Sequence, residues 1–121
     1  ALLNVHEPPN FIHWRLPDHL KTVFQEGMIT SDEPGVYVEG SHGIRIENLI
    51  LCVKDSQDGL LHFETLTLCP IDLSAVKMEY LDCEEKKWLD QYHEMVYEKI
   101  KAFLPEEERE WLKNVTSPIR D

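Results

Sequence analysis

Two glutamates stand beside apolar runs of the kind that form β-strands. Glu33 lies in the stretch GMITSDEPGVY, and Glu47 lies in HGIRIENLILCV. An ionised carboxylate among apolar residues is costly unless it is paired or binds a metal. Carboxylate oxygens are hard ligands, which suit Mn²⁺, Mg²⁺ or a carboxylate-rich Zn²⁺ or Co²⁺ site. The two residues are therefore candidate metal ligands.

Both glutamates also have a structural interpretation. Arg45 precedes Glu47 by two residues on the same predicted strand face, so the two could form an internal ion pair. Glu33 precedes Pro34 and Gly35, a pair typical of turns, where a glutamate is simply exposed. Residue types alone leave these interpretations open.

His6 ends the first apolar run, in NVHEPP. A histidine there can be a half-buried polar residue, or it can orient a substrate and stabilise an oxyanion. The other five histidines lack the spacing of metal ligands, which favours structural roles for His13, His19, His42, His62 and His93. The sequence contains no nucleophile-elbow serine and no Gly-rich phosphate loop.

Composition limits the partners of the chain. Its 121 residues are 42% hydrophobic, which suits one modest domain or part of a larger one. The net charge of −11 disfavours nucleic acid, and no apolar run approaches the roughly 18 residues of a membrane span. Cys52 and Cys69 lie in apolar runs without C-x-x-C spacing, so all three cysteines are expected to be reduced, as in a cytosolic protein. A disulfide or zinc site is the weaker alternative.

The order of elements predicts strands first and helices second. Strands are expected at 27–30, 36–38, 44–53 and 60–71, with a helical turn near 18–24, turns at 33–35 and 39–41 and a polar loop at 54–59. The strand at 44–53 is apolar on both faces, which predicts cover on both sides.

The period changes after Pro70. Asp82 and Glu85 have the spacing of a capping box. An amphipathic helix should follow, with an inward face formed by Trp88, Tyr92, Met95, Val96, Lys99 and Phe103. Pro105 should end it and open a second helix over 105–115, whose glutamates suit a helix N-terminus.

Several linked motifs resemble the C-terminal part of an Xaa-Pro aminopeptidase (aminopeptidase P), of the creatinase/methionine-aminopeptidase superfamily. They are NVHE, EGMITSDEPGVY, HGIRIEN and FETLTLCPIDL, in this order. The last third is similar to the C-terminal extension of the larger members, at Pro70, Trp88, Tyr92, His93, Trp111 and Pro118. The resemblance implies an α+β fold. Residues 1–70 would form the C-terminal half of a pita-bread catalytic domain with antiparallel strands, and residues 71–121 a helical extension.

The same resemblance implies a dinuclear site with two divalent ions, commonly manganese. Glu33 would be one metal ligand with a proton-shuttling role, and Glu47 the carboxylate that bridges both ions. His6 would contact the substrate and stabilise the tetrahedral intermediate, and Arg45 would support the site. The implied reaction is hydrolysis of the bond between the N-terminal residue and a following proline, in the cytoplasm, on peptides with proline in second position.

Several departures qualify this expectation. Two Asp ligands and one His ligand of the family, the His in an H-G-x-G stretch before NVHE, are absent. The chain is therefore expected to be a fragment, inactive alone, that self-associates as a dimer or binds the missing N-terminal portion. Pro8, Val36 and residues 10–25 also depart from the family pattern.

Two alternative classes remain. One is a non-catalytic pita-bread module that binds other proteins, which retention of both glutamates disfavours. The other is a prolidase or methionine aminopeptidase, which the C-terminal extension disfavours.

Overall fold

The computed structural model describes residues 9–10, 12, 15 and 22–119. Residue contacts divide the chain into two compact units, Ala1–Thr67 and Leu68–Asp121. The described residues of the first unit form five strands: β1 (Ile29–Asp32), β2 (Gly35–Val38), β3 (His42–Arg45), β4 (Asn48–Lys54) and β5 (Leu61–Thr65). The second contains the helices α1 (Cys83–Ile100) and α2 (Glu106–Val115) and the 3-10 turns Leu73–Ala75, Met78–Tyr80 and Lys101–Phe103.

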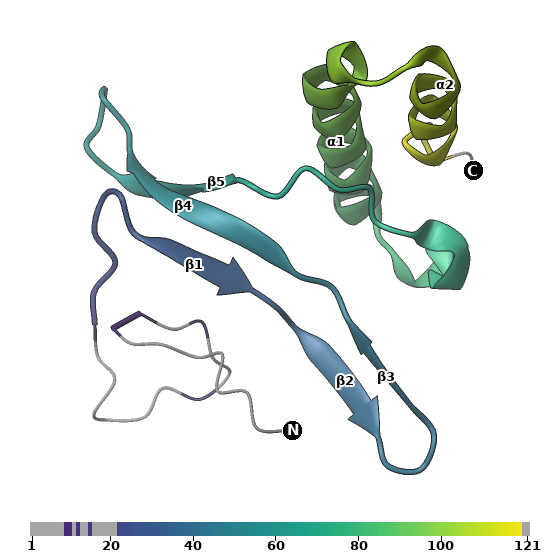
Figure 1. The fold of residues 1–121 in the computed structure, drawn as a ribbon. Coiled ribbons are helices and arrows are strands. Elements are labelled where there is room, and N and C mark those ends of the chain that lie inside the picture. Colours follow the sequence, from purple (N-terminus) through teal and green to yellow (C-terminus); the bar gives the residue numbers. More distant parts are fainter. Residues whose placement is uncertain (1–8, 11, 13–14, 16–21, 120–121) are drawn as a thin grey trace. The chain divides into compact units, whose positions relative to one another are not determined.

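The strands of the first unit form a long antiparallel ribbon. β1 and β2 follow one another in line, and β3 and β4 return beside them (Figure 1). β5 pairs with the other edge of β4, which gives a sheet of order β1-β4-β5 beside the two-stranded β2-β3 sheet. The order of antiparallel strands first and helices second agrees with the predicted α+β fold.

The predicted turn at Glu33–Pro34–Gly35 is wrong. The chain runs through these residues without reversing, because the pairing register is the same on both sides. Asp32 lies opposite Asn48, and Gly35 lies opposite Arg45. Only the ladder is interrupted: the Ile46 N–H donates to the Pro34 carbonyl at 3.3 Å, and proline has no N–H to return that bond.

The strand expected at 44–53 is consequently two strands, β3 and β4, with residues 46 and 47 between them. The turn predicted at 39–41 is confirmed, since the Ser41 N–H donates to the Val38 carbonyl at 3.0 Å and Gly40 has a φ of +72°. The polar loop before β5 is confirmed as well. Of the helical turn predicted near 18–24, residues 22–24 are not helical, and the rest lies outside the described residues.

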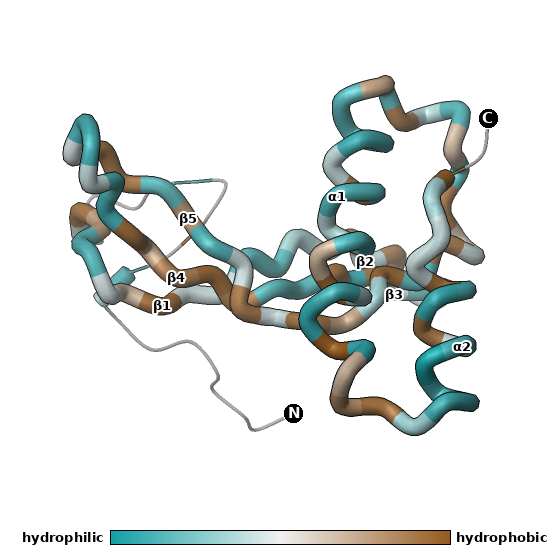
Figure 2. The backbone as a smooth tube through the Cα atoms, turned by 90° about the horizontal axis from the view of Figure 1, so that it is seen from above, coloured by the Kyte–Doolittle hydropathy of each residue, from teal (hydrophilic) through white to brown (hydrophobic). Residues whose placement is uncertain are grey.

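The two faces of β4 differ in burial. Ile50 and Cys52 are buried on one face, where Phe24 packs edge-on against Phe63 at 5.0 Å between ring centroids. On the other face, Leu49 is 46% exposed, and Ile29 of β1, which lies opposite Leu51 on the same face, is 55% exposed. β4 is largely apolar along its length (Figure 2). The prediction of cover on both faces is therefore wrong for this chain.

The helical unit begins as the capping pattern predicts. The Asp82 carboxylate accepts from the N–H groups of Glu84 and Glu85, both at 2.8 Å, and the Glu85 side chain accepts from the Asp82 N–H. Asp82 therefore satisfies donors that an uncapped helix would leave unpaired. α2 follows Pro105 and carries Glu106, Glu107 and Glu108 in its first turn, as predicted.

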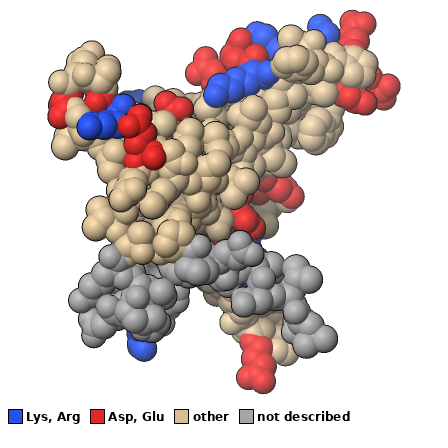
Figure 3. Space-filling model, turned by 60° about the vertical axis from the view of Figure 1, so that its left-hand side comes forward, with Lys and Arg blue, Asp and Glu red and all other residues tan. Residues whose placement is uncertain are grey.

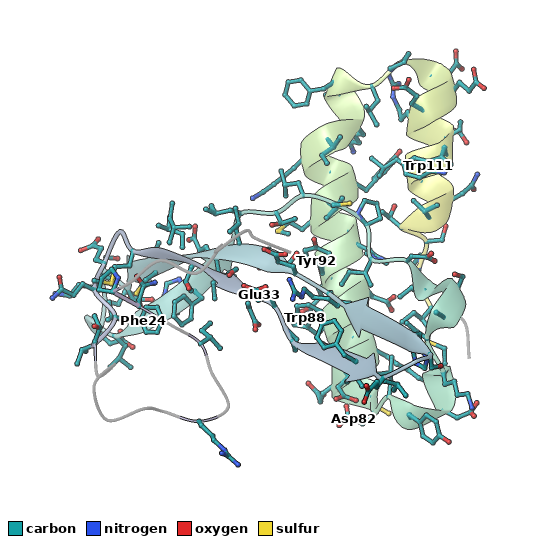
Figure 4. The ribbon with its side chains drawn as sticks, turned by 60° about the horizontal axis from the view of Figure 1, so that its bottom comes forward. Phe24, Glu33, Asp82, Trp88, Tyr92 and Trp111 are labelled. Atoms are coloured by element: carbon teal, nitrogen blue, oxygen red, sulfur yellow. The ribbon has the colours of Figure 1, made fainter. Side chains whose placement is uncertain are left out.

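The core of the helical unit is formed by Tyr92, Val96 and Leu112. Trp88, expected on the inward face, is 52% exposed and stacks on Tyr92, and Phe103, in the 3-10 turn after α1, is 84% exposed. Figure 4 labels Trp88 and Tyr92 on one side of α1. The predicted inward face is therefore confirmed at Tyr92 and Val96 and wrong at Trp88 and Phe103. Leu89 and His93 are buried as well and were not part of the prediction.

Among the cysteines, Cys52 is buried and free, as predicted, whereas Cys69 is exposed. Within the described part of the chain, neither helix has the length and apolar character needed to cross a membrane.

Candidate functional site

Glu33 and Glu47 occupy the two interruptions of the ribbon (Figure 4 labels Glu33). The register that pairs Asp32 with Asn48 and Gly35 with Arg45 places Glu33 directly opposite Glu47. Directly opposite residues of an antiparallel pair project to the same face, with Cβ atoms about 4.5–5.5 Å apart. The fold thus brings together the two carboxylates that the sequence singled out.

Arg45 binds Glu33 rather than Glu47. Its Nη1 lies 3.0 Å from Glu33 Oε2, so the ion pair crosses the ribbon instead of running along one strand. The interpretation of Arg45 and Glu47 as an internal ion pair is therefore wrong among the described residues, although the charge of Glu47 still acts on Arg45 at longer range. Glu47 is exposed, and the side chain of Glu33 is more sheltered.

Two further residues hold this arrangement. The Ser31 hydroxyl donates to Glu33 Oε1 at 2.8 Å, and Arg45 Nε donates to the Tyr37 hydroxyl at 2.7 Å. Each Glu33 oxygen therefore has a partner on the same face. The hydrogen bond to Tyr37, with the charges of Glu33 and Glu47 adding to it, holds the pKa of Arg45 above its ordinary value, so the guanidinium stays cationic.

Neither Ser31 nor Tyr37 emerged from the residue pattern as a site residue. A signal was present, because Gly40 marks a hairpin tip. Counting residues outward from that tip places Ser31, Glu33, Tyr37 and Arg45 on one face. A turn at residues 33–35, which the sequence pattern predicts, would break this register and would not place these residues on one face.

The donor set fits a hard divalent cation. Two carboxylates facing each other repel, and the single positive charge of Arg45 offsets only part of that repulsion. A divalent cation would supply the rest and is matched by carboxylate oxygens. Within the described residues no three His, Cys, Asp or Glu side chains cluster as a complete metal site, so Glu33 and Glu47 could supply only part of a ligand set.

The described histidines fall into two groups, exposed and buried. His6, His13 and His19 lie outside the described residues. His42 and His62 are exposed, beside Ser41 and Glu64. His93 is fully buried in the helical unit, and its Nε2 accepts from the Ile71 N–H at 3.1 Å. This contact confirms its structural role.

Comparison with known proteins places these features in a family. Residues 2–54 match metallopeptidase family M24, and residues 59–119 match the C-terminal region of peptidase M24. The chain is 40% identical over 97% of its length to a probable Xaa-Pro aminopeptidase P of Coprinopsis cinerea. It is 41% identical over 97% to the one of Laccaria bicolor. It spans 20% and 19% of these relatives.

A solved structure agrees with the fold. It is an X-prolyl aminopeptidase from Caenorhabditis elegans, described as a cytosolic enzyme with a di-nuclear active site. The two share 34% sequence identity with a TM-score of 0.70, over 79% of this chain and 17% of that one. The α+β prediction, with strands from a pita-bread domain and C-terminal helices, is confirmed by this likeness. The chain therefore belongs to metallopeptidase family M24.

Proposed function

We propose that the chain is part of a dinuclear-metal aminopeptidase that hydrolyses the bond between an N-terminal residue and proline. The carrying observation is that Glu33 and Glu47 face each other across one ribbon, with Glu33 fixed by Ser31 and Arg45. The named relatives and the di-nuclear site of the similar structure support the reaction and the metal count. The chain spans about a fifth of the relatives' length, so the activity belongs to a larger assembly of residues.

The proposed roles follow the positions of the side chains. Glu33 would bind one ion and shuttle a proton, and Glu47 would bridge both ions, for which manganese is the proposed identity. When bound, two such ions supply Lewis acidity and lower the pKa of a nucleophilic water. Arg45 would keep Glu33 oriented through the ion pair that its Nη1 makes with Glu33 Oε2. His6 would contact the substrate.

Residues 1–70 are proposed to belong to the catalytic domain and residues 71–121 to its helical extension. A cytoplasmic location is also proposed, because the similar structure is that of a cytosolic enzyme. The substrates would be peptides with proline in second position, and neither nucleic acid nor membrane is a proposed partner.

The decisive experiment measures metal and turnover together. In a protein that supplies the two Asp and one His ligands, Glu47→Gln should abolish hydrolysis of an Xaa-Pro peptide and remove bound Mn²⁺ measured by atomic absorption. Glu39→Gln, at the hairpin tip, is the matched control and should retain both. Full activity in Glu47→Gln would overturn the proposed role.

The 121-residue chain alone should release no product from an Xaa-Pro peptide with added Mn²⁺, because the described residues supply only two carboxylates to the site. Robust turnover would contradict this. A protein with all ligands present that binds partners but neither Mn²⁺ nor substrate would favour the non-catalytic binding module.

A further inference from the structure

Tyr37 lies across two glycines, Gly35 and Gly43. A Cβ added at Gly43 would come within 2.6 Å of Tyr37 Cδ1, and one added at Gly35 within 2.7 Å of the Tyr37 hydroxyl oxygen. Both distances are shorter than real Cβ contacts. The aromatic ring therefore occupies the space that side chains at these two positions would need.

Backbone conformation does not explain these glycines. Among the described residues, positive φ values occur only at Gly27, Gly40 and Gly59. Gly35 and Gly43 have backbone angles that other residues can adopt. The nearest atoms to an added Cβ at either position all belong to Tyr37. What these glycines provide is space for the tyrosine ring.

Strand stability explains only one of them. Gly43 lies directly opposite Tyr37, and an aromatic residue that covers a cross-strand glycine is a known stabilising pair. Gly35 is instead two residues before Tyr37 on the same strand, beneath the hydroxyl end of the ring. Its missing Cβ keeps open the place where the Tyr37 hydroxyl accepts the Arg45 Nε bond.

We propose that Gly35 and Gly43 are positioning residues of the candidate site. They let Tyr37 lie flat, Tyr37 holds Arg45, and Arg45 holds Glu33 across the ribbon. An alanine at either position lifts the ring and releases the guanidinium from its hydroxyl. The effect on catalysis rests on the proposed function, whereas the effect on Arg45 does not.

The test follows Arg45 in the 121-residue chain by NMR. Gly43→Ala and Gly35→Ala should speed exchange of the Arg45 Nε–H with water by about tenfold, as for loss of one hydrogen bond to a charged group. Amide shifts of β1 and β4 should stay in place. Val36→Ala, exposed in the same strand and on its other face, is the control and should leave exchange unchanged.

Tyr37→Phe separates positioning from strand stability. It keeps the ring and removes the hydroxyl, so it should speed Arg45 Nε–H exchange as the alanine variants do, and Gly35→Ala should then add nothing. Unchanged exchange in both glycine variants would overturn the proposal, as would an additive effect of Gly35→Ala on Tyr37→Phe.

Activity provides the second measurement, in a protein that carries the remaining ligands. Gly35→Ala should lower kcat about tenfold or more with KM nearly unchanged, as for a residue that orients a ligand. If the unsubstituted protein hydrolyses no Xaa-Pro peptide, the proposed function fails while the NMR result still decides the role of the glycines.

Discussion

At the scale of single residues, the Arg45 guanidinium makes two contacts from different atoms. Nη1 meets Glu33, and Nε meets Tyr37. A planar guanidinium can serve both partners at fixed angles, whereas a lysine ammonium is a single point of charge. Arg45 is therefore a geometric support for Glu33 as well as a positive charge.

We expect Arg45→Lys to retain the charge beside Glu33 and lose the geometry. In a protein with all ligands, kcat for an Xaa-Pro peptide should fall about 10- to 100-fold, as when an outer partner of a metal ligand is lost. Steady-state kinetics with saturating Mn²⁺ is the measurement. Arg109→Lys, in α2 of the helical unit, is the control, and equal activity of Arg45→Lys and Arg109→Lys would contradict the expectation.

His93 adds a pH dependence to the helical unit. Burial lowers the pKa of His93 below its ordinary value, and the charge of Asp90 opposes that shift only in part. The folded state favours the neutral ring, so the unfolded state binds more protons below pH of about 6.5. The free energy of unfolding should therefore fall as the pH is lowered through that value.

Urea unfolding at pH 7.5 and pH 5.5, followed by tryptophan fluorescence, measures this loss. In His93→Gln the amide oxygen can still accept from the Ile71 N–H, but no ring titrates. In that variant, the free energy of unfolding should differ less between pH 7.5 and pH 5.5 than it does in the unsubstituted chain. Equal differences in both proteins would show that other groups control the acid sensitivity.

At the scale of elements, the ribbon shows where residue patterns succeed and where they fail. The tip at Gly40 and the cap at Asp82 are local features, so a few neighbouring residues were enough to predict them. The turn prediction at Pro34 fails because proline followed by glycine is compatible with both a turn and an extended strand with one missing N–H. Only pairing with β3 and β4 decides between the two.

The cap of α1 carries the clearest stability prediction. Asp82→Ala removes both acceptor contacts at the start of the helix. Unfolding of the helical unit should become easier by about 1 kcal/mol, within the usual range for lost caps. Chemical denaturation followed by circular dichroism measures it. Glu94→Ala, exposed in the middle of α1, should change stability by no more than about 0.5 kcal/mol.

At the scale of the whole molecule, an apolar sheet face remains open. Ile29 and Leu49 are exposed on the face that carries Glu33 and Glu47, and Val36 and Ile44 are exposed on the other side of the hairpin. In the view of Figure 3, the charged side chains stand in groups, and uncharged side chains make up the rest of the visible described surface. Open apolar surface and unpaired strand edges favour association.

We therefore expect the 121-residue chain to self-associate, or to bind the portion of a relative that it lacks. Size-exclusion chromatography at two concentrations tenfold apart should show a larger species at the higher one. Leu49→Lys should shift the chain towards monomer, and Lys86→Arg in the helical unit is the control. A monomer at both concentrations would contradict this expectation.

The functional roles of Glu33, Glu47 and Arg45 stay predictions, which the motifs alone supply. The contact between Arg45 and Glu33 is not predictable from the motifs, because these residues meet only through the pairing of separate segments. Tyr37 was missed for the same reason. His6 stays a prediction, since it lies outside the described residues.

The unbroken register across Pro34 limits where relatives of this chain can gain or lose residues. Insertions at the Gly40 tip leave Glu33 opposite Glu47 as long as Val38 still pairs with His42, because the register of the two arms is then unchanged. A single residue gained or lost within β2 or β3 would instead turn one carboxylate to the other face. Relatives that keep the two glutamates opposite each other should therefore vary in length at the hairpin tip and keep the length of β2 and β3 constant, whereas relatives without them are released from that constraint.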